Sequence, residues 1–205
     1  MSDNERYERK PGLAGSFSKS YTYTDELGNN LYRKIKCVTK NPECPKFYYF
    51  ERWEDGHWRG KKTPDEKILE GVRIVPYRLP TFAGKQSVLL CEGEKDAESA
   101  AALGYMATTS PFGHNNWPAE ITPCFKGMEV YIIYDVDHQG GQWPEKIAAQ
   151  LYRTAWGVFI CRFPDEANRP HEFDLTDYLN EVPPGECQRR DKVTRLRELL
   201  RESLR

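Results

Sequence analysis

The chain has 205 residues, of which 39% are hydrophobic and 13% aromatic, and its 30 Lys and Arg residues nearly balance 31 Asp and Glu residues. This composition excludes a disordered chain, and no apolar run approaches the ~20 residues that cross a bilayer, so we expect no membrane partner. The polar N-terminal sequence has no apolar core, which predicts a cytoplasmic protein without a secretory signal peptide.

The net charge of -1 conceals a strong asymmetry along the chain. The net charge is +4 over residues 1–62, 0 over residues 63–84, -8 over residues 85–185 and +3 over residues 186–205. An acidic block therefore lies between two basic flanks, and near-neutrality does not exclude a nucleic-acid partner.

The N-terminal part of the chain has the pattern of an antiparallel sheet. Residues 1–20 are polar and predict a loose N-terminal segment. Residues 21–84 predict a small antiparallel β-rich subdomain of about four strands, with Asp55-Gly56 as one of its hairpin turns. The six cysteines form no CxxC pair, so we expect no structural zinc.

The pattern changes after residue 84, where apolar runs alternate with helical segments. Continuous apolar runs predict strands buried on both faces, and strand–helix alternation predicts βαβ units. Residues 85–185 are therefore expected to form an α/β domain with a parallel four-stranded sheet flanked by helices. Residues 186–205 predict a basic amphipathic C-terminal helix. The expected strands lie at residues 87–91, 105–109, 129–134 and 157–161.

Carboxylates follow two of the expected strands. Glu92 comes directly after the first strand, and Asp135 and Asp137 follow the third. Because active sites of parallel sheets lie outside the carboxyl ends of the strands, we expect these side chains at one edge. Clustered carboxylates repel each other, and Mg2+ or Mn2+ relieves that repulsion. The pattern indicates phosphoryl or nucleotidyl chemistry with one or two metal ions.

Each acidic group taken alone also fits a structural role. An Asp-x-Asp pair is common in solvated turns, and Asp96 in the first turn of an expected helix complements the helix dipole. Asp174 can N-cap the short helix that runs through Tyr178. These alternatives remain open at the level of the sequence.

Three segments of the chain resemble a known family. Residues 88–97, VLLCEGEKDA, resemble the glutamate motif of TOPRIM domains, and residues 132–141, IIYDVDHQGG, resemble the Asp-x-Asp motif. Residues 174–179, DLTDYL, resemble a segment of the primase branch found in phages and mobile elements. The resemblance covers roughly residues 20–180 and implies a TOPRIM-type fold.

The resemblance also implies roles for individual residues. It implies that Glu92, Asp135 and Asp137 are catalytic and bind metal, with Asp96 as a further metal ligand. The residues that it places near phosphate or nucleotide are Gly93, Lys95, Gly140, Asp174 and Asp177.

The function that follows is metal-dependent nucleotidyl transfer by a primase-type catalytic fragment, which makes primers on single-stranded DNA from nucleoside triphosphates. A TOPRIM nuclease with the same metal site is one alternative, and a non-catalytic nucleic-acid or helicase docking module is another. No zinc-module spacing and no Gly-x-x-x-x-Gly-Lys-Ser/Thr loop occur, so we expect a helicase or zinc-module partner. The residues expected to hold template phosphates are Arg33, Lys34, Lys36, Arg52, Arg59, Lys61 and Lys62.

Overall fold

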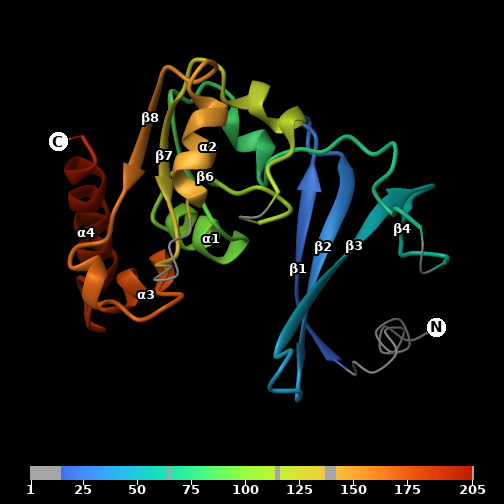
Figure 1. Cartoon of the computed structure of the whole chain (residues 1–205), viewed down its shortest axis with the longest axis horizontal. Coiled ribbons are helices and arrows are strands. Elements are labelled where there is room, and N and C mark those ends of the chain that lie inside the picture. Colours follow the sequence, from blue (N-terminus) through green and yellow to red (C-terminus); the bar gives the residue numbers. More distant parts are fainter. Residues whose placement is uncertain (1–14, 64–65, 114–115, 137–141, 205) are drawn as a thin grey trace. The chain divides into compact units, whose positions relative to one another are not determined.

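The computed structural model describes residues 15–63, 66–113, 116–136 and 142–204. Two of the expected site residues, Asp137 and Gly140, lie outside these ranges. The chain divides into two compact units, Met1–Ile74 and Val75–Arg205, which we call the N-terminal and C-terminal units (Figure 1). Across the described ranges, no helix has the length and apolar character needed to cross a membrane.

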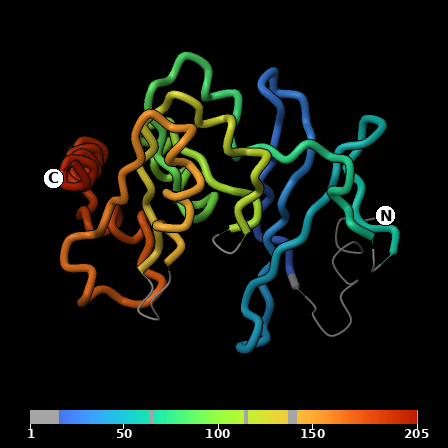
Figure 2. The backbone as a smooth tube through the Cα atoms, turned by 45° about the horizontal axis from the view of Figure 1, so that its top comes forward, coloured from blue at the N-terminus to red at the C-terminus, as the bar shows by residue number. Residues whose placement is uncertain are grey.

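The N-terminal unit is an antiparallel meander. Its strands pair in chain order, β1-β2-β3-β4, and Figure 2 shows the β1–β2 and β2–β3 turns at opposite ends of long strands. Asp55 and Gly56, which join β3 to β4, both have positive φ, 50° and 77°, as the tight hairpin turn requires. The strands are β1 (Gly15–Thr24), β2 (Asn30–Thr39), β3 (Lys46–Glu54) and β4 (His57–Arg59).

Aromatic side chains supply much of the core of this meander. Tyr23 and Tyr32 are fully buried, and their rings stack with centroids 4.6 Å apart. Ile35 and Cys37 lie buried against Phe47 on the neighbouring strand. Cys37 therefore serves as a small apolar side chain in this core.

The C-terminal unit contains a four-stranded sheet in the order β6-β5-β7-β8, and every pairing in it is parallel. The two central strands are buried over most of their length, which explains why their sequences are continuous apolar runs. The strand β6 is shorter than the sequence indicates, because only two residues pair with β5. The strands are β5 (Ser87–Cys91), β6 (Ala107–Thr108), β7 (Glu129–Ile133) and β8 (Gly157–Cys161).

Four α-helices accompany this sheet in the described part of the chain. The helix α1 starts directly after the β5 strand, α2 leads into β8, and α4 lies beside the edge strand β8 (Figure 1). The fold class expected from the sequence, a parallel four-stranded sheet with helices preceded by an antiparallel β-rich unit, is confirmed. The helices are α1 (Glu94–Ala102), α2 (Trp143–Leu151), α3 (Leu175–Asn180) and α4 (Gln188–Glu202).

Candidate functional site

Glu92 and Asp135 meet at the carboxyl ends of the two central strands. In the register of the sheet Cys91 lies opposite Ile133, so the residues that follow both strands emerge at the same edge. The backbone N–H of Asp135 donates a hydrogen bond to Glu92 Oε2 over 3.1 Å. The backbone carbonyl of Glu92 accepts a second bond, from Thr109 Oγ1 at 2.9 Å. The juxtaposition that the sequence predicts is therefore present.

A backbone contact brings a third carboxylate to this edge. Val136 N donates to Phe173 O, and Glu172 N donates to Val136 O, both over 2.9 Å. This pairing places Asp174, the residue after Phe173, beside the segment that carries Asp135. The resemblance of residues 174–179 places Asp174 near the site, but the sequence carries no signal for this backbone pairing, because the two segments lie 37 residues apart and neither forms a regular strand.

Asp174 is the N-cap of α3. Its Oδ1 accepts from Asp177 N at 2.9 Å, and Asp174 N donates to Asp177 Oδ2 at 3.3 Å, which completes a capping box. The Asp174 carboxylate also pairs with the ammonium group of Lys95. The interpretation of Asp174 as an N-cap is thus correct, and both Asp174 and Lys95 already have partners within the chain.

Asp96, in the first turn of α1, accepts hydrogen bonds from the start of α3. Its Oδ1 accepts from Thr176 N at 2.9 Å and from Thr176 Oγ1 at 2.6 Å, and Ser99 and Thr176 are joined through their hydroxyls at 2.9 Å. Asp96 is only 4% exposed. Its geometry is that of a residue which positions α3. The sequence analysis did not identify Thr176 and Ser99 as residues of the site. Each is a hydroxyl residue next to an acidic residue in the sequence, and that pattern is too common to indicate a contact.

The electrostatics of this edge favour a bound cation. Burial and the negative charges of Glu92, Asp96 and Asp174 raise the pKa of Asp135 to about 8, although Lys95 acts in the opposite direction. Burial and the charge of Asp174 likewise raise the pKa of Asp96 to about 6, against the hydrogen bonds from Thr176. A divalent cation near Asp135 would relieve this repulsion.

The oxygen ligands present suit a hard cation. Glu92 and Asp135 supply two carboxylates, and Mg2+ typically takes one or two from the protein and completes its shell with water and phosphate. Within the described ranges, no group of three or more His, Cys, Asp or Glu side chains is arranged to hold a metal ion. The expected third ligand, Asp137, falls outside those ranges.

Gly93, the N-cap of α1, has room for a larger residue. Its φ is -129°, which any residue adopts, and the nearest atom to an added Cβ would be Asp96 Oδ2 at 3.7 Å, an ordinary contact. The fold itself therefore does not require glycine here. Close approach of a ligand to the backbone remains the role that the resemblance implies.

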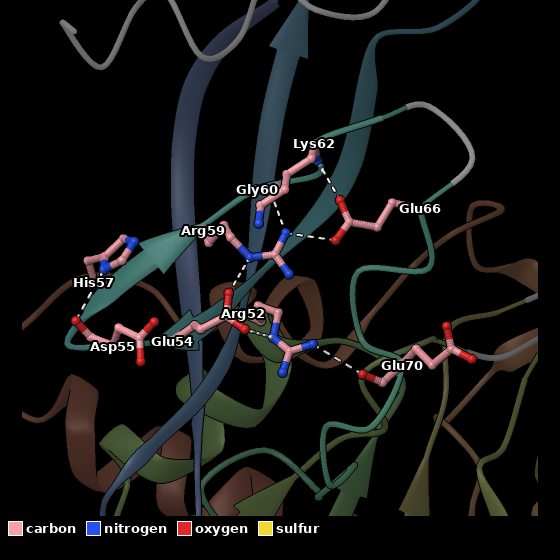
Figure 3. Close-up of polar contacts among 9 residues, drawn as sticks. All are labelled: Arg52, Glu54, Asp55, His57, Arg59, Gly60, Lys62, Glu66 and Glu70. Atoms are coloured by element: carbon pink, nitrogen blue, oxygen red, sulfur yellow. Dashed lines mark hydrogen bonds and ion pairs between the residues drawn. The ribbon is translucent and has the colours of Figure 1, made fainter.

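Three of the seven basic residues expected to bind template phosphates are paired inside the N-terminal unit. Arg59 bonds Glu54 at 2.5 Å and Glu66 at 2.7 Å (Figure 3). Arg52 lies 3.7 Å from Glu54 and donates to the Glu70 carbonyl at 3.1 Å (Figure 3).

The third of these arginines, Arg33, pairs with Glu51 at 2.5 Å. The guanidinium group of Arg33 also lies over the Trp58 ring, 4.8 Å from its centroid.

The lysines of the same set have different surroundings. Lys34 is only 9% exposed and its ammonium lies 4.8 Å from the centroid of the Tyr48 ring. Lys61 and Lys62 are exposed beyond β4, and Lys36 is half-buried on β2. The aromatic residue Tyr48 is 39% exposed, whereas Trp53 packs edge-on against Trp58.

The chain combines an antiparallel β-rich unit with a parallel sheet that has acidic residues at its carboxyl edge, which is the fold class that the resemblance to TOPRIM domains implies. Solved structures that this chain matches include primases. The structure of the zinc-binding and RNA polymerase domains of Aquifex aeolicus primase matches with a TM-score of 0.59 and 13% identity, over 90% of this chain and 40% of that chain. The chain thus spans less than half the length of the Aquifex protein chain.

A second match is a chain in the structure of bacteriophage T7 lagging-strand DNA polymerase with primase domains of two gp4 subunits, an RNA/DNA hybrid and dTTP. Its TM-score is 0.50 at 13% identity, over 95% of this chain and 83% of that one. No family model matches the sequence, and no curated protein matches it. The likeness at this identity is one of fold: the chain has the fold of bacterial and phage T7 primase fragments.

Proposed function

We propose that the chain is a metal-dependent nucleotidyltransferase that makes primers on single-stranded DNA, as the catalytic part of a primase. The observation that carries this proposal is the meeting of Glu92 and Asp135 at the carboxyl ends of β5 and β7, in a fold shared with primase structures. A carboxylate edge whose own charges raise the pKa of Asp135 is suited to a divalent cation and a nucleotide phosphate.

The reaction joins two nucleotides. The 3′ oxygen of one nucleotide attacks the α-phosphorus of an incoming nucleoside triphosphate, the bond to pyrophosphate breaks, and the hydroxyl proton leaves to a base or water. When Mg2+ or Mn2+ is bound, it offsets the negative charge of the phosphates and of the transition state. Glu92 and Asp135, with Asp137 as the resemblance implies, would hold this cation.

The remaining residues of the edge position these groups. The hydrogen bond from Asp135 N keeps the Glu92 carboxylate at the strand ends, and Thr109 fixes the backbone of Glu92. Asp96 anchors the N-terminus of α3 through Thr176, so that Asp174 and Lys95 remain paired next to the site. The residues that we propose to lie near the phosphates of the bound nucleotide are Gly93, Lys95, Gly140, Asp174 and Asp177.

The N-terminal unit would bind the template. The exposed Lys61 and Lys62 and the exposed ring of Tyr48 offer contacts to phosphates and bases. The matched Aquifex structure contains a zinc-binding domain beside its RNA polymerase domain, and this sequence has neither zinc-module spacing nor a Gly-x-x-x-x-Gly-Lys-Ser/Thr loop, so we propose that a zinc module or a helicase acts with it.

One incubation tests the proposal against both alternatives. The chain is mixed with Mg2+, single-stranded DNA and labelled nucleoside triphosphates. New labelled oligonucleotides support primer synthesis, shortened DNA indicates a nuclease, and bound but unchanged DNA indicates a docking module. Glu92→Gln should abolish the product, whereas Glu120→Gln, a change of an exposed carboxylate on a separate 3-10 helix, should leave it unchanged.

A further inference from the structure

A groove lies at the other end of the parallel sheet from the carboxylate edge. It has a volume of about 330 Å³ and runs between the strands and the last turns of α4. Ser87, which lines it, is the first residue of β5, whereas Glu92 follows the last residue of that strand. Five strand residues span roughly 16 Å, so an occupant of the groove would leave the carboxylate edge open. We call this feature the amino-end groove.

The groove combines an apolar floor with two cations on its wall. Leu89, Met106 and Tyr131 contribute to the floor, and Arg197 and Arg201 contribute from α4. Both arginines are exposed, and among the residues that the structure describes neither takes part in an ion pair. They are four residues apart, so they project from the same face of the helix.

Other arginines of α4 are engaged differently. Arg195 pairs with Glu181 and lies over the Tyr178 ring, 4.0 Å from its centroid. Arg190 lies 3.7 Å from its neighbour Asp191. Arg189 is exposed and forms no ion pair within the described residues, but it does not line the groove, so the unpaired positive charge at the groove comes from Arg197 and Arg201.

Exposed apolar side chains mark the same end of the unit. Leu204, at the rim of the groove, is 56% exposed, while Trp156 and Tyr152 are 78% and 79% exposed. Trp156 directly precedes the first residue of β8, and Tyr152 follows the end of α2, so both belong to the amino ends of the strands. In the described part of the C-terminal unit, these three are the large hydrophobic side chains with strong exposure.

We propose that the amino-end groove docks a short acidic segment of a partner protein. An apolar side chain of that segment would enter the groove beside Met106 and Leu204, and its flanking carboxylates would pair with Arg197 and Arg201. Apolar anchors and arginines dominate the binding energy of protein interfaces. Nucleic acid fits less well, because single strands bind along extended basic grooves, and two arginines beside one short pocket do not form such a groove.

The test uses fluorescein-labelled peptide pools of defined pattern and the full chain. The acidic pool has two Asp or Glu residues on each side of one Leu or Phe, a second pool carries Lys in place of the acidic residues, and a third carries Ser in place of the anchor. We expect the acidic pool to bind at least tenfold more tightly than either of the others, as measured by fluorescence anisotropy. Equal binding of the acidic and lysine pools, or no binding of the acidic pool, would overturn the proposal.

Matched variants of α4 locate the site. Arg197→Glu with Arg201→Glu should weaken the acidic pool at least tenfold. Arg189→Glu with Arg190→Glu, which changes the same charge on the same helix, should change its affinity less than twofold. Equal losses in both double variants would show a general charge effect and reject the groove.

A charge-neutral variant keeps the test valid if the double variant fails to fold. Leu204→Ser removes an exposed apolar side chain and should weaken the acidic pool several-fold while the melting temperature stays unchanged. Unchanged peptide binding in Leu204→Ser would contradict the proposed anchor. Loss of binding to a single-stranded oligonucleotide in Arg197→Glu with Arg201→Glu, with peptide binding intact, would instead assign the groove to nucleic acid.

Discussion

The strands of the N-terminal unit and the carboxyl edge of the parallel sheet handle charge in opposite ways. In the N-terminal unit, the arginines of the central and last strands each face a glutamate, as Arg33 faces Glu51 and Arg59 faces Glu54 and Glu66. In the C-terminal unit, carboxylates converge on Asp135 and raise its pKa to about 8. Paired charges of the first kind stabilise a fold by modest amounts, whereas crowding of charges of one sign is relieved when a proton or a cation binds. The paired charges are therefore typical of a structural region, and the crowded carboxylates are typical of a ligand site.

The largest expected effect comes from Asp135→Asn. Under the proposed function this change lowers primer synthesis by at least about 100-fold, because a ligand for the metal is lost. The measurement is the amount of labelled oligonucleotide formed with saturating Mg2+. Activity within tenfold of the unchanged chain would remove Asp135 from the site.

Asp135→Asn, which should lower activity, should raise the stability of the metal-free chain. Since the pKa of Asp135 rises from 3.8 in the unfolded chain to about 8 in the fold, the unfolded state loses its proton first, and stability falls as the pH rises from about 4 to about 8. Asp135→Asn should remove this loss and stabilise the metal-free chain at pH 8 by on the order of 2 kcal/mol, after allowance for solvent screening.

Melting temperatures at pH 5 and pH 8 check this expectation. Mg2+ should raise the melting temperature of the unchanged chain at pH 8 and leave that of Asp135→Asn unaltered. A metal-free variant that melts lower than the unchanged chain at pH 8 would contradict the crowding of carboxylates at this edge.

Asp174→Ala tests the structural role of Asp174, a carboxylate of the C-terminal unit that already has partners within the chain. The change removes the N-cap of α3 and the partner of Lys95, so we expect a loss of about 1–2 kcal/mol in the free energy of unfolding. Urea denaturation measures the loss. Glu120→Ala, at an exposed position whose side chain forms no hydrogen bond or ion pair within the described residues, serves as the control and should cost less than about 0.5 kcal/mol.

In the N-terminal unit, Lys62→Gln and Arg59→Gln compare a lysine beyond the end of β4 with an arginine held by two glutamates. We expect Lys62→Gln to weaken single-stranded DNA binding more, and to reduce the slope of log affinity against log salt by about 0.7. Arg59→Gln should act mainly on stability, because Glu54 and Glu66 already offset its charge. A salt titration of DNA binding by both variants measures the two slopes. A larger change of slope in Arg59→Gln than in Lys62→Gln would contradict the prediction.

Gly93→Ala gives the smallest expected change in stability, below about 0.5 kcal/mol, because its φ of -129° and the space around an added Cβ accommodate alanine. Gly104→Ala, at φ 96° after α1, should cost about 1 kcal/mol. If nucleotide approaches the backbone of Gly93, primer synthesis falls in Gly93→Ala while the melting temperature holds. Unchanged synthesis would show that this backbone does not contact substrate.

Local patterns were sufficient for the architecture. The continuous apolar runs of β5 and β7, the helix after Glu92 and the Asp55-Gly56 turn each carry their own signal, so the parallel sheet and the meander could be predicted. The length of β6 could not, because pairing with β5, and not residue preference, decides where that strand ends.

Within the candidate site, the sequence by itself indicated that Glu92 and Asp135 lie at the same edge of a parallel sheet. The strand order of the structure, in which β5 and β7 are neighbours, decided that the two residues meet. Only the tertiary structure decided what Asp96 and Asp174 contact. These carboxylates bond to Thr176 and Lys95 through segments about 80 residues apart in the chain. Such long-range contacts depend on how loops pack between elements. The residue type predicts only that a buried carboxylate oxygen accepts a hydrogen bond, and it does not predict from which donor.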